Sequence, residues 1–142
     1  MSPASSLTAR MNCPCCGYPT LPERNAYEIC ELCNWEDDGQ DEENAEEVCG
    51  GPNSDYSLAE ARKNFKLYRV MYAPERDQRI TGRDSPLEYD TKGRLMAAFE
   101  SMLGGEQVSR AELEAEIERL ERLLQDETTR QVREYERKHS GA

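Results

Sequence analysis

Four of the six cysteines in this 142-residue chain form two pairs with the same internal spacing. Residues 13–17 read CPCCG, residues 30–33 read CELC, and thirteen residues lie between the pairs. This order is close to the C-x2-C…C-x2-C signature of a four-cysteine zinc site. Two thiolates separated by two residues on a tight turn can occupy adjacent corners of a tetrahedron around one ion. The predicted ligands of a single Zn²⁺ ion are Cys13, Cys16, Cys30 and Cys33.

The residues around the first pair favour the tight turn that such a site needs. Pro14 fixes φ at the start of the turn, and Gly17 permits a positive φ directly after the second ligand. We expect each pair to form a zinc knuckle, with a short β-hairpin built from residues 18–35, including the alternating run 26–29. Four thiolates fill every position of a tetrahedral zinc ion, so the predicted metal is structural and not catalytic.

The two remaining cysteines have no place in this set of ligands. Two roles stay open for Cys15: an inert residue whose thiol faces the turn, or a spare thiol that is sensitive to oxidation. A dithiol redox motif at Cys13 and Cys16 is disfavoured, because a glycine and two prolines follow and prevent the helix that would lower a thiol pKa. We expect Cys49, which stands alone in VCGGPN, to be a small buried hydrophobic residue.

The distribution of charge limits the class of partner. Residues 1–60 carry two basic residues, Arg10 and Arg24, against 13 acidic ones, whereas residues 61–142 carry 16 of each sign. The whole net charge of −11 therefore lies in the cysteine-bearing part. Binding to nucleic acid is disfavoured, because phosphate recognition needs a basic face. An acidic face suits a basic protein partner, or it keeps the chain soluble.

The composition also bears on the compartment and on the need for a metal. Apolar residues make up 37% of the chain and charged residues 33%, so we expect a modest core that a structural metal would reinforce. No apolar run is long enough to cross a bilayer, and the first ten residues lack the apolar stretch of a secretory signal. We expect a cytoplasmic protein without membrane contact, in which free thiols persist.

The organisation along the chain is expected to be of the α+β class: a small zinc ribbon of two knuckles and a short β-hairpin, then a helical C-terminal half with a long terminal helix. Residues 1–10 read as a disordered leader, 11–50 as the zinc-ribbon-like acidic unit, 51–73 as a hinge and packing helix, and 74–142 as a helical extension. Local start signals mark the three helices. These signals are Ser57 with Glu60, Ser85 with Pro86, and Ser109 with Glu112.

The last helix is expected to run to about Lys138, with apolar residues at Leu113, Ile117, Leu120 and Leu124. Two heptads are too few to indicate a coiled coil. Packing within the chain, a homodimer through residues 110–138, and binding to a helix of another protein all remain open.

Two further features between the cysteines and the first helix allow more than one interpretation. Trp35 either shields the metal site or contacts a partner. The acidic run 36–47 is either a solvated loop or a docking face for a basic protein. It is not a calcium-binding EF-hand loop, because Gly39 comes too early in the pattern.

The segment CPCCGYPTLPERNAYEICELCNWEDDG, followed by GGPNSDYSLAEARKNF, resembles the cysteine-rich CPCC family of small bacterial proteins. The resemblance covers about residues 11–72. It implies a compact zinc-ribbon-like unit followed by a helix, with Cys13, Cys16, Cys30 and Cys33 as ligands. It implies no established catalytic activity.

No catalytic arrangement is visible, since the single histidine, His139, lies in a polar tail and no phosphate-binding loop occurs. We therefore expect a non-enzymatic, zinc-stabilised acidic module that binds a basic protein, with an immunity or antitoxin protein as one special case. The alternatives are a thiol-based redox sensor or enzyme that uses Cys15, and a structural protein that self-associates through its last helix.

Overall fold

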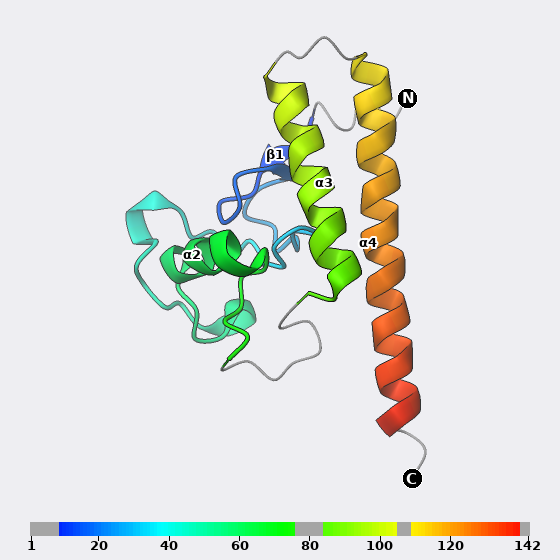
Figure 1. Ribbon diagram of the computed structural model, residues 1–142. Coiled ribbons are helices and arrows are strands. Elements are labelled where there is room, and N and C mark those ends of the chain that lie inside the picture. Colours follow the sequence, from blue (N-terminus) through cyan, green and yellow to red (C-terminus); the bar gives the residue numbers. More distant parts are fainter. Residues whose placement is uncertain (1–8, 76–83, 105–108, 140–142) are drawn as a thin grey trace.

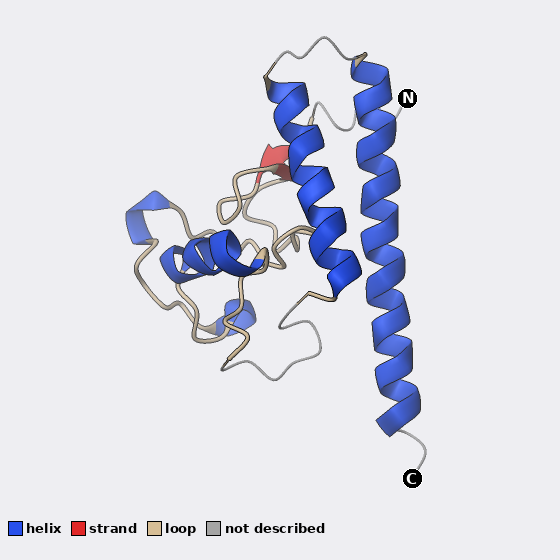
Figure 2. Ribbon diagram, viewed as in Figure 1, coloured by secondary structure: helices blue, strands red, loops and turns tan. Residues whose placement is uncertain are grey.

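The computed structural model describes residues 9–75, 84–104 and 109–139; residues 1–8 of the predicted leader lie outside them. A cysteine-bearing ribbon with little regular secondary structure is followed by three helices, of which the last is the longest (Figures 1 and 2). The predicted α+β class is confirmed. The elements are β1 (Met11–Asn12), β2 (Pro19–Leu21), the short 3₁₀ helices η1 (Glu42–Asn44) and η2 (Gly51–Asn53), α2 (Leu58–Tyr68), α3 (Pro86–Leu103) and α4 (Arg110–His139).

The ribbon contains one short hairpin and one still shorter pairing. β1 and β2 are antiparallel, with Met11 opposite Leu21. The alternating run at residues 26–29 does not form the expected strand and makes only an isolated bridge between Ile29 and Glu36. The reason is local, because Tyr27 has a φ of 60° and leaves the β region of backbone space.

The predicted start of α2 is confirmed, but the helix ends at Tyr68, before the end of the predicted segment 51–73. The Ser57 hydroxyl accepts a hydrogen bond from the Glu60 backbone N–H, as a cap does. The helix ends where Arg69 adopts a left-handed conformation with a φ of 62°. Beyond it the Met71 N–H donates to the Cys33 carbonyl (2.8 Å), so the chain returns to the second knuckle directly after the helix.

α3 and α4 form an antiparallel helical pair (Figure 1). The start signal predicted at Ser85 and Pro86 is confirmed, and Ser85 makes a capping box with Glu88 at the start of α3. Ile117, Leu120 and Leu124 of α4 are buried in the core of the same chain. Most of the apolar seam predicted for the last helix is therefore used within the chain.

The helical pair packs on the ribbon. The Tyr18 ring stacks on Phe99 with centroids 5.8 Å apart, and its hydroxyl donates to Glu100 (2.7 Å). The Arg10 guanidinium makes two hydrogen bonds with Glu121, of 2.6 and 2.9 Å. Ribbon and helices thus share one buried cluster.

A buried lysine joins α3 to the end of α2. The Lys92 ammonium donates to the Arg69 carbonyl (2.9 Å), which is one of the carbonyls left free where α2 ends, and to the Asp84 carboxylate (2.7 Å). Both charged side chains are almost fully buried. Burial raises the pKa of Asp84 to about 6, although Lys92 opposes this shift.

Within the described residues, no helix combines the length and the apolar character needed to span a bilayer.

Candidate metal centre

The two cysteine pairs fold into turns with matching backbone hydrogen bonds. In the first turn the Gly17 N–H donates to the Cys13 carbonyl (2.8 Å), and in the second the Asn34 N–H donates to the Cys30 carbonyl (2.9 Å). Each pair's leading cysteine also donates its own N–H across the turn, to Tyr18 and Trp35 respectively. Because these bonds repeat, the two turns present their cysteines in the same way.

Each turn closes on a residue with positive φ. Gly17 has a φ of 83°, as its lack of a Cβ allows, and Asn34 has a φ of 71° at the corresponding position of the second turn. Asparagine tolerates this region better than most residues do. Gly17 was predicted from the sequence, whereas Asn34 was missed, although it directly follows the last cysteine of the second pair.

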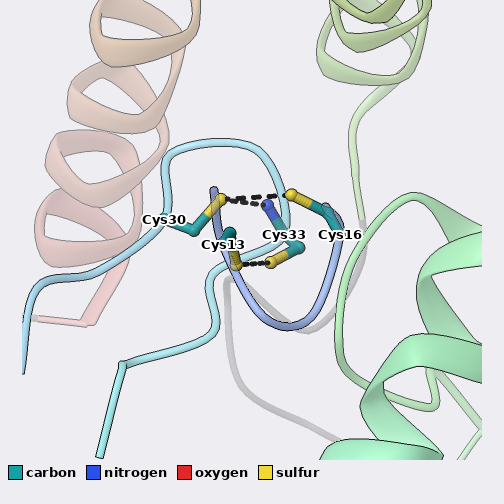
Figure 3. A group of neighbouring side chains, drawn as sticks. All are labelled: Cys13, Cys16, Cys30 and Cys33. Carbon is teal, nitrogen blue, oxygen red and sulfur yellow. Dashed lines mark hydrogen bonds between the residues drawn. The ribbon is translucent and has the colours of Figure 1, made fainter. Parts of the chain in front are cut away.

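The four sulfur atoms of Cys13, Cys16, Cys30 and Cys33 converge at one point, with all Sγ atoms within 4.8 Å of one another (Figure 3). The Cys13–Cys33 and Cys16–Cys30 Sγ distances are both 3.7 Å. Tetrahedral zinc with Zn–S bonds of 2.3 Å would separate its sulfur ligands by about 3.8 Å. The thiols are free and too far apart for a disulfide, and their spacing fits a tetrahedral metal ion.

Hydrogen bonds to Cys30 hold its sulfur in place. The backbone N–H groups of Leu32 and Cys33 donate to the Cys30 Sγ at 3.3 and 3.4 Å, and the Thr20 hydroxyl lies 3.0 Å from the same atom. Donors of this kind stabilise a thiolate and orient it toward a metal. Thr20 was not predicted, because nothing in its local sequence indicates a contact with a residue ten positions away.

The thiols of this cluster differ in acidity. Burial alone would raise the pKa of Cys30, but its hydrogen bonds with the other thiols and with Thr20 hold that pKa well below the usual value. Burial raises the pKa values of Cys16 and Cys33 well above the usual value, and most of their hydrogen bonds with neighbouring thiols raise them further. Cys16 and Cys33 therefore become thiolates beside Cys30 more readily when a cation offsets the charge.

Comparison with known proteins agrees with this geometry. The family model described as "Cysteine-rich CPCC" matches residues 11–84, just over half of the chain. The chain belongs to the cysteine-rich CPCC family. The match reaches beyond residue 72, where the resemblance seen in the sequence ended, and includes Asp84. No curated protein and no solved structure matches the chain.

The two cysteines of this CPCC chain outside the cluster lie in different surroundings. Cys15 is buried within the first turn, and its pKa is raised: a hydrogen bond with Cys33 lowers it, but burial and the charges of Cys13 and Cys30 raise it more. A raised pKa makes a thiol less reactive. Cys49 is exposed, so the expectation of a buried residue was wrong. Its neighbours Val48 and Gly51 are exposed as well, so this segment lies at the surface.

Trp35 of the CPCC motif region is fully buried, with none of its surface accessible. A side chain in this position cannot contact a partner without local unfolding. Its burial therefore favours an internal role beside the second knuckle over contact with a partner.

The acidic run after the CPCC cysteines is more ordered than a solvated loop would be. The Asp37 carboxylate is buried and accepts hydrogen bonds from the Arg24 guanidinium (2.9 Å) and the Asn25 N–H (2.6 Å). Asp41 caps the short helix η1. Arg62 of α2 binds both the Pro14 carbonyl (2.8 Å) and Glu42 (2.6 Å), which ties this run to the first knuckle.

Proposed function

We propose that this protein is a non-enzymatic, zinc-stabilised acidic module that binds a basic protein. The four-sulfur cluster is the observation that carries the proposal. Its donors are all sulfur, which favours zinc over the hard cations that prefer oxygen. Four thiolates would leave no coordination position for water or substrate, so the metal would serve the fold.

The proposed docking face is the outer side of the segment around η1. Glu43, Glu46 and Glu47 are exposed and make no ion pair with other described residues. Their neighbours are engaged within the protein, since Asp41 pairs with Arg24 and Glu42 with Arg62. The three free carboxylates are thus held on an ordered surface, where they can attract a basic partner and speed its association. An immunity or antitoxin protein that covers a basic toxin would be one instance.

Metal content per chain tests the first half of the proposal. The purified protein should contain one zinc ion per chain, measured by elemental analysis together with native mass spectrometry. The Cys30→Ser variant should lose the ion. The control Cys49→Ser, which removes an exposed thiol outside the cluster, should retain it. A folded wild-type protein without metal would contradict the proposal.

Affinity capture from the native host tests the second half. The wild-type chain should retain a basic protein, and added salt should weaken the capture. The triple variant Glu43→Lys, Glu46→Lys and Glu47→Lys should lose it. A control variant should retain the basic protein. It carries the same change of charge on exposed residues of the helical pair, namely Asp90→Lys, Glu112→Lys and Glu136→Lys. Capture that survives the first variant, or the absence of any basic partner, would contradict the proposal.

A further inference from the structure

α4 is longer than the elements that cover it. Its last bonds to α3 are those of Glu127, which accepts from the Ser85 hydroxyl (2.8 Å), and of Gln131, which donates to Glu88 (3.0 Å). The helix then continues to His139, for about two more turns. Figure 1 shows this red end extending past α3. Within the described residues, no hydrogen bond or ion pair joins residues 132–139 to another element.

A groove of about 350 Å³ lies beside the second knuckle, where α4 passes it. One wall comes from the knuckle and the other from α4. We call it the knuckle groove; its lining residues are Ile29, Cys30, Glu31, Asn34, Leu124, Gln125, Thr128 and Thr129.

An apolar strip leads from the knuckle groove to the free end of α4. Thr128, Val132 and Tyr135 follow Leu124 at intervals of four, four and three residues, so all four share one face of the helix. Val132 and Tyr135 are 38% and 50% exposed, and Ile29 across the groove is more than half exposed. The strip therefore offers apolar surface that the described part of the chain leaves uncovered.

The two ends of this surface carry opposite charge. Residues 130–139 contain four basic residues against two acidic ones, although the chain as a whole is strongly acidic. The knuckle groove contains Glu31, whose carboxylate is held by Gln125 (2.5 Å). This carboxylate is exposed and its hydrogen-bond partner is an uncharged amide, so an added cationic group would be favourable there.

We propose that a second copy of this chain covers the strip, in an antiparallel dimer whose two-fold axis passes near Val132. In this arrangement the free end of each α4 enters the knuckle groove of the other copy. Tyr135 of one copy then lies near Thr128 of the other, and Arg137 and Lys138 approach Glu31. A two-fold axis repeats each contact, so both strips are covered and both opposite-charge contacts form at once.

A second copy fits this surface better than an unrelated helix because both complementary parts are present in one chain. The free end is basic and apolar, and the groove is acidic and apolar. The inference does not depend on the proposed docking face around η1, which lies on a different segment.

The mass of the zinc-loaded full chain in solution tests the inference. Light scattering after gel filtration should give a dimer for the wild type. Tyr135→Glu should weaken dimerisation about tenfold or more, because it places a charge in the apolar strip. The control Leu67→Glu, at an exposed leucine of α2, should remain dimeric. Circular dichroism and zinc content should be unchanged in both variants.

A charge exchange tests the register. Arg137→Glu and Glu31→Lys should each weaken the homodimer, and a mixture of the two variants should form a heterodimer in which the pair is restored with reversed sign. A monomeric wild type would overturn the inference, even if a helix of another protein bound to the strip. A dimer that Tyr135→Glu leaves intact would also overturn it, and so would a mixture that fails to restore dimerisation.

Discussion

The ribbon and the helical pair are stabilised by different means. The ribbon has five residues in paired strands, and it is held by its sulfur cluster and by side chains that bind backbone groups, as Arg62 and Asp37 do. The helical pair needs no such device, because α3 and α4 bury Leu95, Phe99 and Leu120 against each other and against the ribbon. One chain thus combines a region built around a candidate metal site with a region built on apolar packing.

Removal of the metal should have the largest effect and should separate the two regions. Structural zinc binds zinc-finger peptides with an apparent free energy of roughly 10–16 kcal/mol, and this binding free energy acts as folding free energy. A strong chelator should therefore open the ribbon while α3 and α4 stay helical. Trp35 is the only tryptophan and is fully buried, so its emission should shift to longer wavelength while far-UV circular dichroism keeps most of its helical signal.

A reciprocal change serves as the control. Leu120→Ala removes a buried side chain from the helical pair and should cost about 2–5 kcal/mol of unfolding free energy, measured by denaturant titration. Zinc content should be unaffected. If chelation and Leu120→Ala each abolish both signals together, the two regions form one cooperative unit and the contrast between them is wrong.

A smaller effect should follow the loss of the Thr20 hydroxyl. Thr20→Val removes the group 3.0 Å from the Cys30 sulfur and should lower zinc affinity roughly 10- to 100-fold, as loss of other groups that orient metal ligands does. Competition with a chromogenic chelator measures this change. Thr20→Ser keeps the hydroxyl and should retain most of the affinity; an equal loss in both variants would point to packing as the cause.

The smallest effect should come from Glu127 in the helical pair. Arg130, and then Gln131 and Ser85, lower the pKa of Glu127 from 4.5 to about 2. A carboxylate with a lowered pKa stabilises the fold above its unfolded pKa and loses this contribution as the pH falls through its folded pKa. At neutral pH, Glu127→Gln should therefore be less stable than the wild type, by less than about 1 kcal/mol.

The pH dependence is the sharper measurement. The difference in unfolding free energy between wild type and Glu127→Gln should shrink as the pH falls from 4.5 toward 2. Denaturant titrations at each pH, monitored by the far-UV circular dichroism of the helices, measure this difference. A difference that does not vary with pH would show that the carboxylate charge is not its source.

The features that could be predicted from the sequence are those that depend on a few neighbouring residues. Cysteine spacing indicated the cluster, and the serines before α2 and α3 indicated their starts, because a turn or a cap depends on neighbouring residues. The assignment of the four cysteines as ligands of zinc itself stays a prediction, and so do the domain boundaries.

The missed features depend on contacts between distant residues. Nothing in the sequence around Asp37 indicates that its carboxylate is buried and paired with Arg24. Nothing in the sequence around Cys49 indicates that its side chain is exposed to solvent. The docking of the helical pair on the ribbon, through Tyr18 and Arg10, likewise has no periodic signal.

The bonds of Lys92 have a consequence for any attempt to dissect the molecule. The family match ends at Asp84, yet the cation that neutralises this carboxylate, and that also binds the last turn of α2 at Arg69, comes from the next helix. A fragment cut at the family boundary would lose the ammonium group that binds the Arg69 carbonyl at the end of α2, and Asp84 would become its last residue without its counterion. The family match is thus shorter than the set of residues that these bonds hold together.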